Sequence, residues 1–343
     1  MRRFVKPVLL IVLLSVVGGA AAAAMMLRAR IHEPYKGFAG DEQFLDVPAG
    51  TSAPAIGRML IAAGVVRDDL TFRAALLWTR RSQQLQAGEY RFERASSAVD
   101  VIGRLARGDV YARRLTFPEG LTIREMSRVY ESRGFGSASS FLAAARHTAL
   151  IQDLDARAAD LEGYLFPETY ALTRSTTVER LVRSMVDRFR ATYTDELRQR
   201  AGEQGLTARQ VVTLASLVEK ETARPEERPL VAAVYRNRLK IGMGLQADPT
   251  VVYALLQAGR YDGNIRRTDL AFDSPYNTYR YAGLPPGPIA APGRGSIEAA
   301  LTPASVSYLY FVSRNDGSHV FSETLAEHNR NVREFQILYF RRR

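Results

Sequence analysis

The sequence contains no cysteine, which excludes disulfide bonds, thiolate metal sites and cysteine nucleophiles. Its four histidines, His32, His147, His319 and His328, occur in no His-x-x-Glu-His or similar metal-ligand pattern. We interpret His319 and His328 as hydrogen-bonding surface residues rather than metal ligands. The chain also lacks a Gly-x-Ser-x-Gly turn and a glycine-rich phosphate loop after a strand. Metal-dependent, serine-nucleophile and phosphate-cradling enzymes therefore gain no support, and no cofactor is expected.

Acidic residues are outnumbered by basic ones, 36 against 47, which gives a formal net charge of +11. Part of the excess lies at the two ends of the chain, in Arg2, Arg3 and Lys6 and in residues 341–343. The other arginines are spread among acidic residues, and no zinc finger, RNA-recognition signature or sustained basic helix is present. We therefore expect no nucleic-acid partner, because anionic lipid or an anionic polymer explains the charge equally well.

Charge is absent altogether from residues 8–27, VLLIVLLSVVGGAAAAAMML, a run of 20 residues. This length crosses the core of a bilayer. A cleaved signal peptide is the alternative, because the alanine run offers a small-residue cleavage site. The run is longer than the usual core of a signal peptide, so we favour an uncleaved transmembrane helix. Residues 1–7 would then lie in the cytoplasm and the chain after about residue 30 outside it.

An internal repeat follows a short predicted linker at residues 28–42. Residues 47–66, VPAGTSAPAIGRMLIAAGVV, align with residues 117–136, FPEGLTIREMSRVYESRGFG. Each copy predicts an extended apolar residue, a Pro-x-Gly turn, a helix and a glycine stop. Residues 43–136 are therefore predicted to form a small α/β region, which either binds an extended polymer or serves only as scaffold.

Residues 137–343 are predicted to be mainly helical at first and loop-rich later, so the fold class is α+β. The segment 161–172, LEGYLFPETYAL, is too aromatic and too broken by proline for a helix. Residues 277–296 are rich in proline and glycine. A loop of this length in a compact domain is more often a binding or active-site loop than filler.

One apolar helix in this region ends in two carboxylates. Thr207 and Gln210 have the spacing of a capping box, which predicts a helix from there to about residue 222. On a helical wheel, Glu219 and Glu221 both border the buried arc, on opposite flanks. The face predicted to meet water carries Thr213, Ser216 and Lys220.

A carboxyl held against apolar neighbours has a raised pKa, as a general acid requires. The alternative is a helix C-terminal turn whose carboxylates pair with Lys220, Arg224 or Arg228, because structural carboxylates outnumber catalytic ones. Periodicity does not choose between Glu219 and Glu221.

Four long segments resemble one known family. They are EGYLFPETY (162–170), LASLVEKETARPEERPLVAAVYRNRLKIGMGLQADPTVVYAL (214–255), SPYNTYRYAGLPPGPIAAPG (274–293) and YLYFVSRNDGSHVFSETLAEHNRNV (308–332). Together they resemble the distinctive blocks of the YceG-like (MltG) endolytic murein transglycosylases, in order along the chain.

The resemblance implies a single-pass inner-membrane protein with a small LysM-like domain near the membrane and a periplasmic catalytic domain at 137–343. Such an enzyme is a lyase that cleaves the β-1,4 bond between N-acetylmuramic acid and N-acetylglucosamine in nascent glycan strands. It leaves 1,6-anhydro-N-acetylmuramic acid ends, which terminate elongation. In the family the catalytic acid is the first glutamate of the Glu-Lys-Glu-Thr string, here Glu219. One carboxyl suffices because the C6 hydroxyl of the substrate attacks in place of water, whereas ordinary glycosidases need two.

Further residues are expected to line the substrate groove or to support the acid. The expected substrate-binding residues are Gln246, Asp248, Tyr276, Asn277 and Tyr279, with Glu162 and Glu168 as reserve carboxyls. The expected supporting residues are Glu221, Arg224 and Arg228. For the loop residues, turn formation is the competing interpretation.

Expected partners are peptidoglycan strands and inner-membrane lipid, with peptidoglycan synthases as further candidates. Two alternatives to the transglycosylase remain open. One is a non-enzymatic envelope scaffold, in which the repeat region binds glycan and the rest recruits cell-wall synthesis proteins. The other is a hydrolase of the lysozyme type, which differs in product because hydrolysis adds water to the new end.

Overall fold

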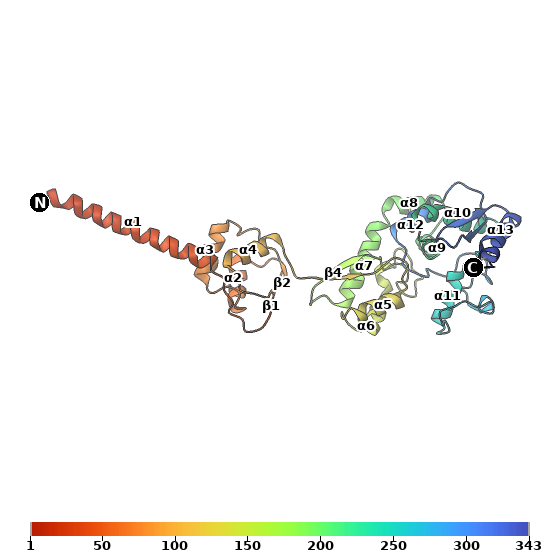
Figure 1. The fold of residues 1–343 in the computed structure, drawn as a ribbon, viewed down its shortest axis with the longest axis horizontal. Helices are drawn as coiled ribbons and strands as arrows, with labels where there is room; N and C mark the ends of the chain where they lie inside the picture. Colours follow the sequence, from red (N-terminus) through yellow and green to blue (C-terminus); the bar gives the residue numbers. More distant parts are fainter. Residues whose placement is uncertain (1, 342–343) are drawn as a thin grey trace. The chain divides into compact units, whose positions relative to one another are not determined.

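The computed structural model describes residues 2–341, which combine helices with short strands (Figure 1). The predicted α+β class is confirmed. Two compact units divide the chain: unit 1 comprises Met1–Arg113 with Ala171–Ser175, and unit 2 comprises Arg114–Tyr170 with Thr176–Arg343. The boundary at Arg113 precedes the predicted one at residue 136, so the second repeat copy belongs to unit 2.

Helix α1 (Arg2–His32) is, among the described residues, the one helix long and apolar enough to cross a membrane. Its apolar window, Leu13–His32, has a mean hydropathy of 1.4 over 20 residues. The end of α1 differs from the predicted linker at residues 28–42. Ile31 is still helical and is only 2% exposed, because it packs into the core of unit 1.

Unit 1 is built around one small antiparallel sheet. The strands β1 and β2 pair with Leu45 opposite Tyr90. Helices pack their apolar sides into a core with Leu60, Phe72, Tyr90 and Ile102, each at most 1% exposed. After α1, the elements are β1 (Gln43–Val47), α2 (Ala53–Ala62), α3 (Asp69–Thr79), β2 (Gly88–Phe92) and α4 (Ala98–Arg107).

The two copies of the sequence repeat adopt the same local structure. Gly50 and Gly120, in the Pro-x-Gly turns, have φ of 80° and 77°. Gly64 and Gly134, at the ends of the helices, have φ of 68° and 69°. Glycine is the residue that adopts this left-handed backbone at no steric cost, so the repeat is confirmed. The helix of the second copy is α5 (Ile123–Ser132). The copy lies between β3 (Arg113–Thr116) and α6 (Ala138–Ala144), and β3 pairs with β4 (Thr169–Leu172).

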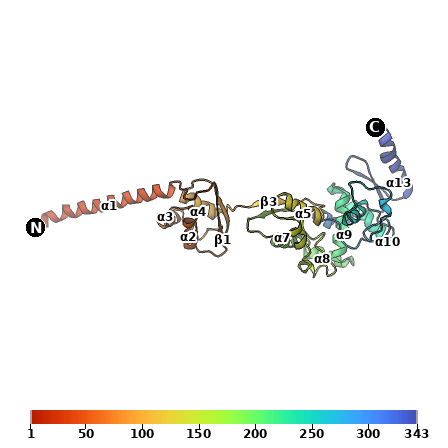
Figure 2. The ribbon, with the colours of Figure 1, turned by 90° about the horizontal axis from the view of Figure 1, so that it is seen from below.

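The rest of unit 2 is mainly helical and surrounds α9 (Ala208–Glu221). Helix α10 (Arg228–Lys240) lies beside α9 in both views (Figures 1 and 2). The other α-helices and strands are α7 (Val178–Thr192), α8 (Asp195–Glu203), α11 (Asp248–Gln257), α12 (Arg294–Leu301), β5 (Tyr310–Ser313), β6 (His319–Ser322), α13 (Leu325–Val332) and α14 (Tyr339–Arg341). Short turns of other helix types are η1 (Thr148–Ile151), η2 (Pro225–Glu227), η3 (Asp269–Ala271) and η4 (Arg333–Leu338).

Helix α9 begins as predicted but has no solvent-exposed face along most of its length. Thr207 and Gln210 form the complete capping box, with the side chain of each bonded to the backbone of the other. The prediction that Thr213 and Ser216 meet water is wrong: they are 1% and 0% exposed. The Ser216 hydroxyl donates to the carbonyl of Thr213 and accepts from the backbone N–H of Ile289 at 3.1 Å. The helical-wheel prediction of an exposed face failed because other helices enclose α9 from several sides, namely α8, α10, α11 and α12.

Candidate active site

The Glu219 side chain leaves α9 on one flank and enters a polar cluster in which both of its oxygens accept hydrogen bonds. Its Oε2 accepts hydrogen bonds from the backbone N–H of Gly293 at 2.9 Å and from the hydroxyl of Ser296 at 2.7 Å. Its Oε1 accepts from Nη2 of Arg228 at 3.3 Å. The Glu219 side chain is 6% exposed. Three hydrogen-bond donors therefore hold a carboxyl that has little contact with water.

A second carboxylate, Glu119, belongs to the same cluster. Arg228 Nη2 bonds its Oε2 at 3.1 Å, so this arginine bridges Glu119 and Glu219. Burial and the nearby charge of Glu219 raise the pKa of Glu119. Sequence reasoning missed Glu119, although a signal existed: it replaces Ala49 of the first copy inside the repeated Pro-x-Gly turn.

Glu221 leaves α9 on the opposite flank and lines a pocket of about 340 Å³. We call this the Glu221 pocket; it is lined by Glu221, Arg238, Leu245, Gln246, Asp248, Tyr279, Phe311, Val312, Ser313, His319 and His328. The Oε2 atom of Glu221 is buried and has no hydrogen-bond partner among the described residues. Burial, and then the charge of Asp248, raise the pKa of Glu221 to about 7, although Tyr235 and Arg238 act in the opposite direction. The carboxyl of Glu221 is therefore partly protonated at neutral pH.

Three of the predicted substrate-binding residues meet in the Glu221 pocket. The Tyr279 hydroxyl donates to Oδ1 of Asp248 at 2.6 Å, and burial raises the pKa of that hydroxyl. Gln246 adopts an unusual left-handed backbone with φ of 48°, and its N–H donates to the carbonyl of Thr278. A non-glycine residue with positive φ is uncommon and tends to be found where function requires it.

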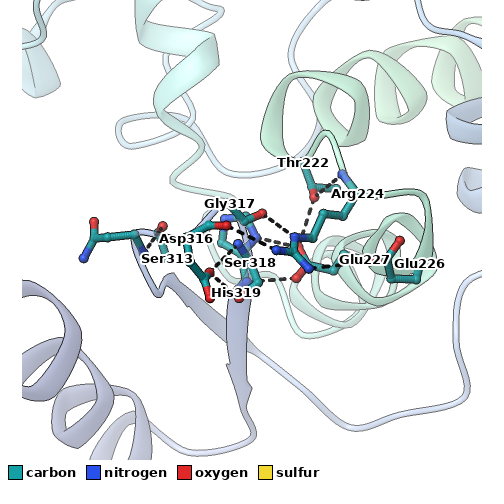
Figure 3. A network of polar contacts seen from close by, with 10 residues as sticks. Thr222, Arg224, Glu226, Glu227, Ser313, Asp316, Gly317, Ser318 and His319 are labelled. Carbon is teal, nitrogen blue, oxygen red and sulfur yellow. Dashed lines mark hydrogen bonds and ion pairs between the residues drawn. The ribbon is translucent and has the colours of Figure 1, made fainter.

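The hairpin of β5 and β6 forms the far wall of the Glu221 pocket and is fastened to the end of α9. Glu227 accepts the backbone N–H of His319 at 2.9 Å, lies 2.7 Å from His319 Nδ1 and accepts the Thr222 hydroxyl at 3.0 Å (Figure 3). Burial alone would raise the pKa of Glu227, but the hydrogen bonds from His319 and Thr222 lower it. The guanidinium of Arg224 also donates to the carbonyl of Gly317 in the hairpin turn at 2.9 Å. Arg224 therefore holds the pocket wall.

His319 and His328 thus line a pocket, although the sequence suggested surface residues. The His319 side chain is 14% exposed and bonded to a carboxylate as described above. Among the described residues, no group of His, Asp and Glu is arranged to hold a metal ion.

The comparisons with known proteins agree on one family. The model of the YceG-like family matches residues 45–334. The chain belongs to the YceG-like family.

Two relatives and one solved structure show how far the likeness extends. The chain is 32% identical over 302 residues to the endolytic murein transglycosylase of Bacillus subtilis (strain 168), covering 83% of this chain and 82% of that protein. It is 31% identical over 323 residues to the endolytic murein transglycosylase of Streptococcus pneumoniae serotype 2, covering 84% of this chain but 57% of that protein. A YceG-like protein from Listeria monocytogenes, in a 2.6 Å crystal structure, matches with a TM-score of 0.58 at 30% identity, covering 84% of this chain and 98% of that one.

Two of the predicted groove residues in this YceG-like chain lie outside the Glu221 pocket. Asn277 is 0% exposed, and its side-chain amide donates to the carbonyls of Leu270 and Phe272. Tyr276 packs its ring against Tyr253 at 4.9 Å and does not line the Glu221 pocket. The amide of Asn277 therefore holds the loop, as the competing interpretation expects, and its substrate role stays a prediction.

The two reserve carboxyls lie outside the Glu221 pocket. Glu168 forms an ion pair with Arg188 on the surface. Glu162 is buried, accepts from the N–H of Ile123 at 3.1 Å and from the Tyr253 hydroxyl at 3.3 Å, and lines a separate pocket of about 210 Å³. Burial, and then the charge of Asp160, raise the pKa of Glu162 to about 8.

Proposed function

We propose that this protein is an endolytic murein transglycosylase that cuts nascent peptidoglycan strands between N-acetylmuramic acid and N-acetylglucosamine and leaves 1,6-anhydro ends. Membership of the YceG-like family and the names of the two relatives support the activity. The observation that carries the chemistry is the Glu221 pocket. It holds one carboxyl with a pKa of about 7 beside an aspartate whose charge helps to keep it protonated.

We assign the proton donor to Glu221 rather than to Glu219. The resemblance placed the acid at Glu219, the first glutamate of the string. Glu219, however, bonds Gly293, Ser296 and Arg228 and lines no part of the Glu221 pocket. A general acid needs a proton to give and a path to the substrate, and Glu221 supplies both. Glu219 is then a positioning residue that joins the end of α9 to the start of α12.

In the proposed reaction a single carboxyl serves first as the acid and then as the base. Glu221 gives its proton to the glycosidic oxygen, and the bond from that oxygen to the anomeric carbon of N-acetylmuramic acid breaks. The C6 hydroxyl of the same sugar then bonds the anomeric carbon, and its proton returns to the Glu221 carboxylate. No water is consumed, and the enzyme regains its initial protonation state.

Asp248 and Tyr279 have a separate role in this scheme. Asp248 accepts a hydrogen bond from the Tyr279 hydroxyl, which orients its carboxylate beside Glu221. An anionic aspartate suits the N–H of the muramoyl acetamide, whose carbonyl can then stabilise the cationic anomeric carbon, as in substrate-assisted glycosidases. Gln246, exposed at the edge of the pocket, is placed to hold a sugar hydroxyl.

The deciding experiment compares Glu221→Gln with Glu219→Gln. Each full-length variant is incubated in detergent with purified peptidoglycan, and the new ends are identified by mass spectrometry. We expect Glu221→Gln to lose at least about a hundredfold in the release of anhydro ends, the usual contribution of a general acid. We expect Glu219→Gln to retain the reaction at a reduced rate.

Other outcomes point elsewhere. Full activity in Glu221→Gln would exclude it as the acid, and a folded but inactive Glu219→Gln would return that role to Glu219. Ends that carry an added water would identify a hydrolase. Binding to sacculi without any new ends would support the envelope scaffold.

The location and domain assignments are part of the same proposal. The strand–helix–helix–strand order of β1, α2, α3 and β2 supports a LysM-like module in unit 1. We place the N-terminus in the cytoplasm, α1 in the inner membrane and the rest in the periplasm, where peptidoglycan strands and their synthases are found.

A further inference from the structure

Helix α3 of unit 1 has two apolar sides, of which only one is used by the core. Its inner side buries Phe72 and Ala75, which are 1% and 0% exposed. Its outer side leaves Leu70, Leu77 and Trp78 exposed at 61%, 79% and 52%. Large apolar side chains that are exposed together on one element indicate an interaction surface.

The three exposed residues, which we call the stripe, lie on one face of the helix. Leu70 and Leu77 are two turns apart, with the half-buried Ala74 between them, and Trp78 lies beside Leu77. Arg73 borders the stripe and Arg80 follows at the end of the helix, and both are exposed. A stripe of leucine and tryptophan bordered by arginine is typical of helices that lie in the plane of a membrane surface.

Contacts within unit 1 hold α3, and with it the stripe, against α1. Arg30 of α1 donates to the Thr71 hydroxyl at 3.0 Å and pairs with Asp68 at the start of α3. The guanidinium of Arg28 lies 5.2 Å from the centre of the Trp78 ring. Figures 1 and 2 show α3 at the C-terminal end of α1. Helix α3 therefore cannot move independently of the anchor.

A groove between α1 and α3 indicates how deep the stripe lies relative to the membrane span. The groove has a volume of about 650 Å³, and Leu70 lines it together with Ala23, Met26 and Leu27. These three residues belong to the apolar run of α1, so Leu70 lies at the level of the end of the membrane span. The groove is also lined by Arg30, Glu33 and Arg67. A lipid matches it, because its tail is apolar and its headgroup is polar.

We propose that α3 docks on the bilayer surface at the C-terminal end of α1, with Leu70, Leu77 and Trp78 in the boundary between headgroups and acyl chains. Arg28, Arg73 and Arg80 then meet anionic headgroups. The lipid is favoured over a protein partner because the stripe is continuous with a helix that itself fits a membrane span. Unit 1 is thereby held in one orientation on the membrane.

Trp78 is the one tryptophan in the sequence, so tryptophan fluorescence reports on the stripe alone. The full-length protein is reconstituted in vesicles that contain phosphatidylglycerol and lipids brominated near the headgroup or deep in the acyl chain. We expect Trp78 emission to be quenched about twofold or more by shallow bromines, less by deep bromines, and little by aqueous iodide. Vesicles of phosphatidylcholine alone should give weaker bromine quenching and stronger iodide quenching.

A matched pair of variants separates docking from mere proximity to the anchor. The double variant Leu70→Gln, Leu77→Gln should lose the bromine quenching and gain iodide quenching. Val110→Gln, which changes an exposed apolar residue outside the stripe, should behave as the parent. Strong iodide quenching of the parent protein would place Trp78 in water and overturn the proposal. Shielding from both quenchers would overturn it as well, because a protein surface would then cover α3.

Discussion

The two glutamates of α9 predict opposite effects of the same substitution on stability. Glu221 is held in surroundings that disfavour its charge, whereas Glu219 is held by three hydrogen-bond donors. Replacing a glutamate by glutamine removes the charge and nearly keeps the shape. We therefore expect Glu221→Gln to stabilise unit 2 at alkaline pH and Glu219→Gln to destabilise it.

The effect at Glu221 depends on pH in a definite direction. The folded protein binds this proton more tightly than the unfolded chain, since the pKa of Glu221 is raised from 4.5 to about 7. Stability is therefore lost as pH rises from 4.5 to 7, by about 3 kcal/mol in all. Glutamine does not ionise and escapes this loss, while its buried amide retains a desolvation penalty of about 1 kcal/mol. The net expectation is a gain of about 2 kcal/mol at pH 8 and a loss of about 1 kcal/mol at pH 4.5.

The effect at Glu219 follows from its contacts. A glutamine places an N–H₂ group either against Arg228 or against Gly293 and Ser296, so that donors face each other. Leaving a buried donor unpaired costs about 1–3 kcal/mol, and more where a charge is involved. We expect a loss of about 3 kcal/mol at both pH values.

Thermal unfolding of the full-length protein in detergent, followed by near-ultraviolet circular dichroism, measures both effects. For a unit of this size the midpoint should rise by about 4–8 °C for Glu221→Gln at pH 8 and fall by about 6–12 °C for Glu219→Gln. A gain that is equal at pH 4.5 and pH 8, or a shift of both variants in the same direction, would refute the reasoning.

Two further predictions concern the activity and the polar cluster. The rate of anhydro-end release should fall as pH rises through about 7, where Glu221 loses its proton. Asp248→Asn should shift this fall to lower pH, because the charge of Asp248 helps to raise the pKa of Glu221. A pH–rate profile whose alkaline side is the same in Asp248→Asn as in the parent would contradict this. Gly293→Ala should destabilise unit 2 by about 1 kcal/mol in the same unfolding assay, since its new Cβ would lie 1.9 Å from Oε1 of Glu119 and would displace that side chain from Arg228; Glu119→Ala in the same chain should restore most of the loss.

Local chemistry made much of the fold predictable from the sequence. The capping box of Thr207 and Gln210 gave the start of α9, and the paired glycines of the repeat marked the same turns in both copies. Periodicity also placed Glu219 and Glu221 on opposite flanks. It failed for Thr213 and Ser216, because a wheel assumes that one side of a helix faces water.

The walls of the site were not predictable in the same way. His319 and His328 come from segments far from Glu221 in sequence, and only the folding of unit 2 brings them to one pocket. A histidine without a ligand pattern carries no sign that a distant glutamate will bind its ring, as Glu227 does. Asn277 illustrates the reverse case, because an amide in a loop suits a sugar and a carbonyl equally well.

Because the β5–β6 hairpin is bonded to the end of α9 and lines the Glu221 pocket, the pocket is complete only after the C-terminal part of the chain has been synthesised. The ribosome makes the chain from its N-terminus, so α1 and unit 1 are complete long before β6 (His319–Ser322) emerges. A chain that stops before β6 contains Glu221 but lacks one wall of its pocket, so water reaches the carboxyl and its pKa returns toward the ordinary value. With the role that we propose for Glu221, copies that stop before β6 should be inactive, and transglycosylase activity should appear only when the last segment has folded.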